Sequence, residues 1–243
     1  MRISLLNTVV DNLDLNEALD EIVKLVNNKR YNYVVTPNVD HIIQLERDKE
    51  FREVYDNADL ILTDGMPLIW ISKLKKTPIK EKVSGSDLFP EVCSLSAKKG
   101  YSIFLLGAAE GVAAKAASNL MEKYEGLNIC GTYSPCYGFE KDDEEIKKII
   151  AMINEKKPDI LAVGLGAPKQ EKFIYKYREQ LKVPVSLAIG ASIDFEAGNI
   201  KRAPKWMQKS GLEWFYRLMK EPKRMFKRYI IDDLKILGLY FKY

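Results

Sequence analysis

Pro158-Asp159-Ile160-Leu161-Ala162-Val163-Gly164-Leu165-Gly166-Ala167-Pro168-Lys169-Gln170-Glu171 is the stretch of this 243-residue chain that decides its fold class. Asp159–Val163 is a mainly apolar run, typical of a strand buried on both faces. Two glycines end that run, and an amphipathic pattern starts near Lys169, with Pro168 suited to the first position of a helix. The stretch therefore predicts a strand, a glycine turn and the start of a helix.

The turn after this strand is a candidate ligand site. In open parallel sheets, ligands bind beyond the carboxyl ends of the strands, and the N–H groups that begin the next helix favour anions. Gly164 and Gly166 would line such a crevice, with Lys169 and Gln170 in the first helical turn. A tight strand-to-helix connection that binds no ligand is the alternative, because a lone Gly-x-Gly is a weak signal.

The same strand and helix periods alternate on both sides of this stretch. Strands are predicted at Ile103–Leu106, Leu127–Gly131, Asp159–Val163 and Val185–Ile189, and helices at Val112–Tyr124, Asp143–Lys156 and Gln170–Leu181. Such alternation indicates right-handed βαβ units with helices covering a parallel sheet. The sequence thus predicts an α/β fold: a Rossmann-like parallel sheet flanked by helices.

Dinucleotide and ATP motifs are incomplete in this chain. Gly107-Ala108-Ala109-Glu110-Gly111 follows a predicted strand, yet it lacks the Gly-x-Gly-x-x-Gly spacing that brings a pyrophosphate against the backbone. The segment Gly164–Gly166 lacks the third glycine, and no Gly-x-x-x-x-Gly-Lys-Ser/Thr sequence occurs. These gaps argue against a dehydrogenase or a kinase.

Two earlier apolar runs also end in polar residues. Tyr33–Thr36 is followed by Pro37, which leaves Thr36 and Asn38 at the carboxyl end of a strand. Leu60–Thr63 is followed by Asp64, whose carboxylate would face the same edge of the sheet. The alternatives are local: Thr36 and Asn38 as turn or cap groups, and Asp64 as the cap of a helix that begins near Pro67. Further on, Ser86 or Asp87 is expected to cap a helix that runs to about Lys99.

Composition places the chain among soluble globular proteins. No run approaches the roughly 18 to 20 uncharged apolar residues of a membrane span, and the N-terminus is too polar for a signal peptide, so we expect a cytoplasmic protein. The three cysteines have no paired spacing and the chain has one histidine, so free thiols are expected and a zinc site is not. No metal or cofactor is expected from the sequence.

The C-terminal segment differs from the rest in charge. Residues 201–243 contain twelve Lys or Arg against four Asp or Glu, a net charge of +8, which leaves −4 for residues 1–200. We therefore expect a core at residues 1–200 and a basic amphipathic helical appendage at residues 201–243. A basic appendage on a near-neutral body suits an anionic partner: nucleic acid, phospholipid headgroups or a pyrophosphate.

Two helices, Pro204–Met219 and Pro222–Leu239, are predicted in the appendage. Five cations align on one stripe if the helical rotation carries through Pro222: Arg217, Lys220, Arg224, Lys227 and Arg228. Guanidinium groups bind phosphate oxygens bidentately, and aromatic residues beside basic ones suit a lipid interface. A solvated charged face is the alternative for the exposed lysines. In the turn region before the appendage, Asp194 and Glu196 could cap, pair with tail cations or coordinate, and capping or pairing is expected.

These stretches together resemble the WecG/TagA/CpsF glycosyltransferase family over nearly the whole chain. The resemblance rests on ordered motifs: Thr36-Pro37-Asn38-Val39-Asp40-His41, Thr63-Asp64-Gly65-Met66-Pro67, Gly85-Ser86-Asp87-Leu88-Phe89, Phe104-Leu105-Leu106-Gly107, Val163 to Glu171, Arg202-Ala203-Pro204-Lys205-Trp206, Gly211-Leu212-Glu213-Trp214 with Arg217, and Glu221-Pro222-Lys223-Arg224.

The resemblance implies a metal-independent, inverting transferase that uses a UDP-sugar donor and a polyprenyl-diphosphate-linked sugar acceptor. In the wall teichoic acid branch, which is the most similar, N-acetylmannosamine moves to undecaprenyl-diphosphate-linked N-acetylglucosamine through a β-1,4 linkage. A site on an anionic membrane surface, at the inner face of the cell membrane, follows from the acceptor. A different donor, UDP-glucose or UDP-N-acetylmannosaminuronic acid, is the alternative within the family.

Site residues follow from the same resemblance. Asp64 matches the proposed base, and Thr36, Asn38 and Gln170 match pocket residues. Arg217 and Arg224 match tail arginines that close over the pocket. Relatives often carry arginine where this chain has Lys82 and Lys227, so the charge is kept but the bidentate fork is lost.

Two further alternatives concern partners. A nucleic-acid-binding α/β protein would also use a basic appendage, although the resemblance argues for no nucleic acid. The apolar faces of the predicted tail helices also suit a homo-oligomer in solution.

Overall fold

The structure is a computed structural model that describes residues 1–28, 30–220, 222–226 and 233–243, without the side chains of residues 209, 224, 225 and 233. Its strands are β1 (Arg2–Leu5), β2 (Thr8–Asp11), β3 (Asn32–Val35), β4 (Leu60–Ile61), β5 (Ser102–Gly107), β6 (Asn128–Tyr133), β7 (Ile160–Gly164) and β8 (Val185–Ala188). Its helices are α1 (Leu15–Asn27), α2 (Val39–Gln44), α3 (Lys49–Asp56), α4 (Met66–Leu74), α5 (Gly85–Lys99), α6 (Val112–Lys123), α7 (Asp143–Lys156), α8 (Lys169–Leu181), α9 (Ser192–Glu196), α10 (Lys205–Lys209), α11 (Glu213–Lys220), α12 (Pro222–Phe226) and α13 (Ile236–Lys242), with 3-10 turns η1 (Phe139–Lys141) and η3 (Asp233–Lys235).

Six parallel strands form the central sheet in the order β4-β3-β8-β7-β5-β6. The predicted parallel α/β sheet flanked by helices is confirmed. Its strand order differs from the 3-2-1-4-5-6 order of dinucleotide-binding folds. Because all six strands run the same way, their carboxyl ends share one edge, and β4 and β3 lie at one end of that edge.

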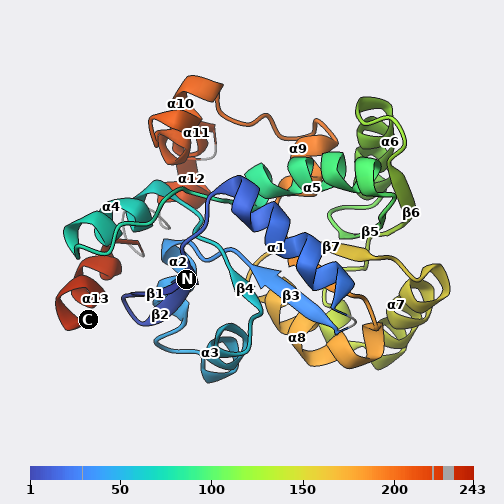
Figure 1. Cartoon of the computed structure of the whole chain (residues 1–243), viewed down its shortest axis with the longest axis horizontal. Helices are drawn as coiled ribbons and strands as arrows, with labels where there is room; N and C mark the ends of the chain where they lie inside the picture. The colour runs from blue at the N-terminus through green and yellow to red at the C-terminus, as the bar shows by residue number, and fades with distance from the viewer. Residues whose placement is uncertain (29, 221, 227–232) are drawn as a thin grey trace.

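Helices cover both faces of the sheet because its strands are apolar on both sides. Along β5, Ile103 and Leu105 pack into one core cluster, and Phe104 and Leu106 pack into the other. The first cluster lies under α1, α5 and α6, and the second under α3, α7 and α8. Figure 1 shows this three-layer arrangement, with α1 and α5 crossing the sheet on one side. This alternation is expected for a strand that is buried on both faces, because successive side chains of a strand point to opposite faces of the sheet.

The hairpin formed by β1 and β2 protects the edge strand β4. The Ile61 N–H donates to Asp11 Oδ2 at 2.9 Å, and Arg2 Nη2 donates to the carbonyls of Ala58 and Asp59 at 2.7 and 2.9 Å. An uncovered edge strand would present open backbone groups to other chains. The hairpin therefore fixes the end of the sheet at which Asp64 emerges.

Glycines at the ends of β5, β7 and β8 allow these strand ends to pack closely. Gly107 has φ +124°, and a Cβ there would lie 2.3 Å from the Gly164 carbonyl oxygen. A Cβ on Gly164 would lie 2.8 Å from the Gly190 carbonyl oxygen. The Ala108 N–H also donates to Gly164 O at 3.0 Å. Gly107 and Gly164 are thus needed for close backbone approach, whatever else they do.

Several helix starts differ from the predictions. The cap of α5 is Ser84, whose side chain accepts from the Asp87 N–H, so the expected caps Ser86 and Asp87 were wrong. Ser84 comes one residue before the helix begins, where a cap has extended backbone and φ near −80°. For α8, Pro168 is the N-cap, so the helix starts at Lys169.

The predicted helix Pro204–Met219 was wrong as a single element. The chain forms α10 and α11 with a break between them, because Gly211 adopts φ +77° and its backbone packs against Met66. The predicted helix Pro222–Leu239 is described only in part, as α12 and α13, and α13 continues to Lys242. The cation stripe through residues 227 and 228 lies outside the described residues.

Glu196, in the turn region before the appendage, pairs with Lys123 of α6 at 3.5 Å.

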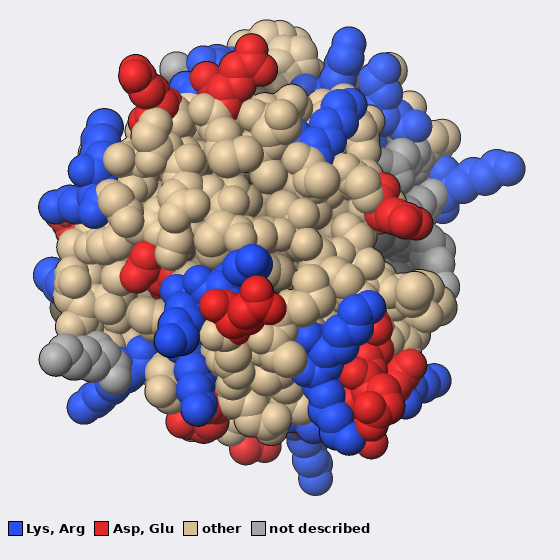
Figure 2. Space-filling model, turned by 90° about the vertical axis from the view of Figure 1, so that its right-hand side faces the viewer, with Lys and Arg blue, Asp and Glu red and all other residues tan. Residues whose placement is uncertain are grey.

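The surface of the body carries both signs of charge. Figure 2 shows the side of the molecule that carries α6, β6 and α7, where acidic and basic side chains lie next to one another on a mainly uncharged surface. The cysteines are free, as expected. Among the described residues, we find no helix with the length and apolar character needed to cross a membrane.

Gly107→Ala should cost more stability than the same change at Gly100, where φ is +74° but a Cβ would meet nothing within 4 Å. A positive φ alone costs about 1 to 2 kcal/mol. The clash with the Gly164 backbone adds about 2 kcal/mol. Guanidinium unfolding of both variants measures the difference. Equal losses in the two variants would show that the strand ends separate freely.

Candidate active site

A cavity of about 360 Å³ lies beyond the carboxyl ends of β3 and β4. It is bordered by α4, by the start of α5 and by the C-terminal helices. Its lining residues are Asn38, Val39, Asp64, Gly65, Met66, Pro67, Trp70, Lys82, Ser84, Ser86, Gln208, Gly211, Glu213, Trp214, Arg217, Leu234 and Ile236. Four residues predicted from the sequence therefore meet in one cavity: Asn38, Asp64, Lys82 and Arg217.

Asp64 is positioned by backbone contacts of the strand end. Its N–H donates to the Pro37 carbonyl at 2.8 Å, which holds the β4 exit against the β3 exit. The next helix, α4, starts at Met66 with Gly65 as N-cap and no side-chain cap. The alternative that Asp64 caps this helix was therefore wrong. Its carboxylate is left to line the cavity.

Opposing effects set the acidity of Asp64. Burial raises the pKa of the carboxyl, while the positive charges of Lys82 and Arg217 lower it. Burial is the larger effect, so the pKa lies above the ordinary value of 3.8. A carboxylate with a raised pKa is a stronger proton acceptor, which suits a general base.

Asn38 has both of the roles considered for it. Its side chain accepts from the His41 N–H at 3.3 Å and caps α2, and it also lines the cavity. Thr36 is buried one residue past β3 and is not among the cavity-lining residues.

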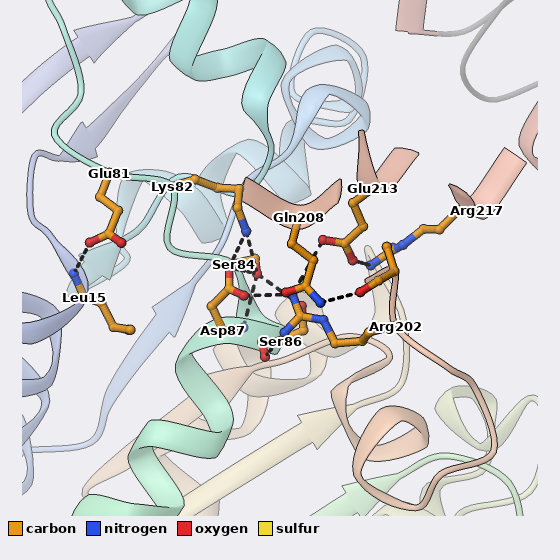
Figure 3. Close-up of polar contacts among 11 residues, drawn as sticks. Leu15, Glu81, Lys82, Ser84, Ser86, Asp87, Arg202, Gln208, Glu213 and Arg217 are labelled. Atoms are coloured by element: carbon orange, nitrogen blue, oxygen red, sulfur yellow. Dashed lines mark hydrogen bonds and ion pairs between the residues drawn. The ribbon is translucent and has the colours of Figure 1, made fainter. Parts of the chain in front are cut away.

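A chain of alternating charges links the body to the C-terminal helices (Figure 3). Lys82 Nζ contacts Asp87 Oδ2, and Arg202 Nη2 donates to Asp87 Oδ1 at 2.8 Å. Arg202 Nη2 lies 3.5 Å from Glu213 Oε2, and Arg217 Nη2 donates to Glu213 Oε1 at 2.7 Å. We call this set, Lys82, Asp87, Arg202, Glu213 and Arg217, the charge chain.

The charge chain is partly buried, which strengthens its interactions over those of surface pairs. Its effect shows on Asp87: despite burial, Lys82 and the hydrogen bonds from Lys82, Ser84 and Arg202 lower the pKa of this carboxyl to about 2. Ser84 Oγ donates to Asp87 Oδ2 at 2.6 Å. The chain has three cations and two anions, so it brings a net positive charge to the cavity wall.

Sequence reasoning missed part of this arrangement. Arg202 and Glu213 were quoted only as parts of motifs and were given no role. The four-residue spacing of Glu213 and Arg217 on a predicted helix was the available local signal. Nothing local pointed to the contact of Arg202 with Asp87, which spans 115 residues.

The glycine turn after β7 lies elsewhere on the same sheet edge. Gly164, Gly166, Lys169 and Gln170 are not among the lining residues of this cavity. Lys169 Nζ pairs with Glu140 at 2.8 Å, and Gln170 is buried, with Oε1 accepting from the Gly190 N–H at 3.1 Å. The strand β8 separates β7 from β3, which explains the distance between the two parts of the prediction.

Three predicted tail cations cannot be placed. The side chain of Arg224 and the whole of Lys227 and Arg228 lie outside the described residues. Arg217 is placed, and it also borders a second cavity, of about 430 Å³. That cavity carries Lys201, Arg202 and Lys220 on its wall. The second cavity therefore has a basic wall.

Glu171 is a buried carboxyl behind the cavity. Its Oε1 accepts from Gln170 Nε2 at 2.8 Å and lies 3.8 Å from His41 Nε2. His41 Nδ1 accepts from the Asn38 N–H at 3.0 Å, which connects Glu171 to the cavity wall. Burial raises the pKa of Glu171 to about 7, with the Asp40 charge adding to the rise.

Comparisons with known proteins extend over nearly the whole chain. A family model described as "Glycosyl transferase WecG/TagA/CpsF family" matches residues 3–243. A Bacillus subtilis (strain 168) protein is 34% identical over 230 residues, 92% of this chain and 88% of its own length. A Bacillus spizizenii protein is 35% identical over 192 residues, 79% and 72% of the two chains. A Staphylococcus aureus (strain MW2) protein is 27% identical over 227 residues, 92% and 87% of the two chains.

All three relatives carry the same name, N-acetylglucosaminyldiphosphoundecaprenol N-acetyl-beta-D-mannosaminyltransferase. The similarity includes the segments that line the cavity, because the family match runs from β1 to the end of α13.

Glu171→Gln should make stability less dependent on pH. The pKa of Glu171 is about 7 in the folded chain against an ordinary value of 4.5, so the folded state holds the proton more tightly. Its contribution is thus complete below pH 4.5 and is lost as the pH rises through 7, by about 3 kcal/mol in total. The free energy of unfolding of the wild type should fall by this amount relative to the variant.

Urea unfolding from pH 4.5 to 8 measures this difference. Glu179→Gln, at an exposed position on the same helix, is the matched control and should run parallel to the wild type. Parallel curves for Glu171→Gln as well would contradict a raised pKa at Glu171.

Proposed function

Because this chain belongs to the WecG/TagA/CpsF glycosyltransferase family, we propose that it transfers N-acetylmannosamine from UDP-N-acetylmannosamine to undecaprenyl-diphosphate-linked N-acetylglucosamine. The product would carry a β-1,4 linkage and belong to the wall teichoic acid linkage unit. The names of the relatives support this transferred sugar and this acceptor. The observation that carries the proposal is the carboxylate of Asp64 in a cavity whose wall holds the cations Lys82 and Arg217.

Asp64 acts as the general base in this proposal. It takes the proton of the acceptor hydroxyl while the hydroxyl oxygen attacks the anomeric carbon of the donor sugar. The bond from that carbon to the UDP oxygen breaks in the same step, so the configuration inverts and UDP leaves. The raised pKa of Asp64 favours this proton transfer.

The departing UDP develops negative charge on its phosphate. Arg217 and Lys82 are held in place by the charge chain before substrate binds, and fixed cations of this kind stabilise a developing charge. The basic wall of the second cavity adds to the positive electrostatic potential around Arg217. In this proposal the protein's own cations do this work, and transfer is independent of added metal.

Residues 201–243 are proposed as an active-site lid and membrane contact on the core of residues 1–200. The lid is proposed because α11 contributes three residues to the cavity wall: Glu213, Trp214 and Arg217. A lipid acceptor requires the protein to work at the inner face of the cell membrane, where the basic appendage meets an anionic surface. The exposed apolar residues of this segment also suit self-association away from the membrane.

Asp64→Asn should lower kcat by roughly 10²- to 10⁴-fold, because an amide cannot accept the proton. UDP release from UDP-N-acetylmannosamine with the lipid-linked acceptor measures this, with a panel of other UDP sugars and with a chelator as parallel arms. Asp194→Asn is the control, since Asp194 does not line the cavity. Near-normal turnover of Asp64→Asn would remove Asp64 from the mechanism, and dependence on added metal would remove the cation role.

Arg217→Gln should lower kcat by roughly 10²-fold with a smaller effect on KM, because its charge acts on the departing phosphate. The variant removes the charge and leaves a shorter polar side chain. Lys147→Gln, which removes an exposed cation of α7, is the control. An unchanged kcat in Arg217→Gln would show that the C-terminal helices take no part in the chemical step.

A further inference from the structure

The helix α4 is apolar on more than its buried side. Leu68, Ile69 and Ile71 are buried in the core, as expected for a helix that packs on the body. The opposite side carries Trp70 and Leu74, which are 46% and 68% exposed. Large apolar side chains on the exposed side of a short helix indicate a second apolar partner.

The helix α13 presents a matching surface next to α4. Leu237 is 56% exposed and Phe241 is 84% exposed, four residues apart on the same face. The two helices lie beside each other at the end of the molecule that holds the C-terminus (Figure 1). Lys75, just after α4, places its Nζ 4.7 Å from the centre of the Tyr240 ring, which ties the two together.

This apolar surface is continuous with the cavity that contains Asp64. Met66 and Trp70 of α4 line that cavity, and so do Leu234 of η3 and Ile236 at the start of α13. Trp70 and Leu234 are exposed as well as lining, so they mark the side on which the cavity opens. The cavity thus has a polar wall at the carboxylate and an apolar wall that leads out between α4 and α13.

We propose that the polyprenyl chain of the acceptor leaves the active-site cavity along Trp70 and between α4 and α13. This inference rests on the proposed function, because the acceptor's diphosphate must sit at the cations while its hydrocarbon chain runs outward. A ligand with a long apolar chain attached to an anionic group matches a cavity that has one polar wall and one apolar wall. Exposed Lys73 and Lys76 border the exit and suit the anionic headgroups of the membrane from which the chain comes. The body of the protein, through α4, therefore also contacts lipid.

The test compares two acceptors in the double variant Leu74→Ser/Leu237→Ser. Both residues lie on the exit and outside the cavity lining, so the cavity itself is unaltered. One acceptor carries N-acetylglucosamine on undecaprenyl diphosphate in detergent micelles, and the other carries it on methyl diphosphate. With the undecaprenyl acceptor, kcat/KM should fall about tenfold or more, because apolar contact area is lost. With the methyl acceptor it should be unchanged. Met121→Ser, an exposed apolar position on α6, is the control and should change neither.

Equal rates for wild type and variant with the undecaprenyl acceptor would overturn the proposed path. An equal loss of kcat/KM with both acceptors would overturn it too, because the substitutions would then weaken binding of the sugar or the diphosphate and not of the hydrocarbon chain. Sedimentation of the wild type and the variant tests a third outcome. If the wild type is a dimer, the variant is a monomer and the acceptor preference is unchanged, the surface is a contact between two copies of the chain and the proposed path is wrong.

A binding measurement separates this inference from the proposed function. Calorimetry with undecaprenyl diphosphate in micelles and with inorganic pyrophosphate requires no sugar transfer. The wild type should bind the lipid form more tightly, and the variant should lose about tenfold of that preference. If the wild type transfers no sugar but shows this preference, the proposed function fails and the chain path stands. If it transfers sugar but shows no preference, the chain path alone fails.

Discussion

The ion pair between Arg202 and Asp87 is the contact on which the candidate active site depends. It joins the first turn of α5 to the segment that leads into the C-terminal helices. Through Glu213 it continues to Arg217, and through Asp87 it continues to Lys82. Because the chain is partly buried, breaking one member leaves another charge without its partner in a site of low polarity. The C-terminal helices are thus attached to the body by the same charges that line the cavity.

The cavity combines the cations Lys82 and Arg217 with the carboxylate of Asp64 and an apolar side. Asp64 follows the end of β4, and Trp70 comes from α4. Of the two cations, Lys82 precedes α5 and Arg217 comes from α11. A sugar, a diphosphate and a hydrocarbon chain each have a matching part of the surface. The proposed chemistry and the proposed chain path therefore depend on one arrangement of α4, α11 and α13.

Much of the fold was predictable because its signals are local. The alternation of strands and helices from residue 101 to 189 gave the parallel sheet, and polar residues after strand ends identified Asn38 and Asp64. Strand order is not a local property, however, so the sequence did not separate the Gly164 turn from the cavity. With β8 between β7 and β3, residues that share a sheet edge lie in different places along it.

The C-terminal segment was the hardest part to predict. Its composition indicated charge and amphipathic helices, but the break at Gly211 depends on a positive φ and on packing against Met66, a residue far away in the sequence. The pairing of Arg202 with Asp87 depends on tertiary structure in the same way. The motifs of the family resemblance contained these residues, while their contacts became visible only in the structure.

The most direct test of this account is the pH dependence of kcat/KM for sugar transfer in the wild type and in Lys82→Met. The account holds that Asp64 is the base and that the charge of Lys82 lowers its pKa. Losing that charge should raise the pKa of Asp64, so the acidic limb of the profile should move to higher pH by roughly one unit. An acidic limb at the same pH in both proteins would contradict the account, because the group that limits the rate would then not respond to Lys82.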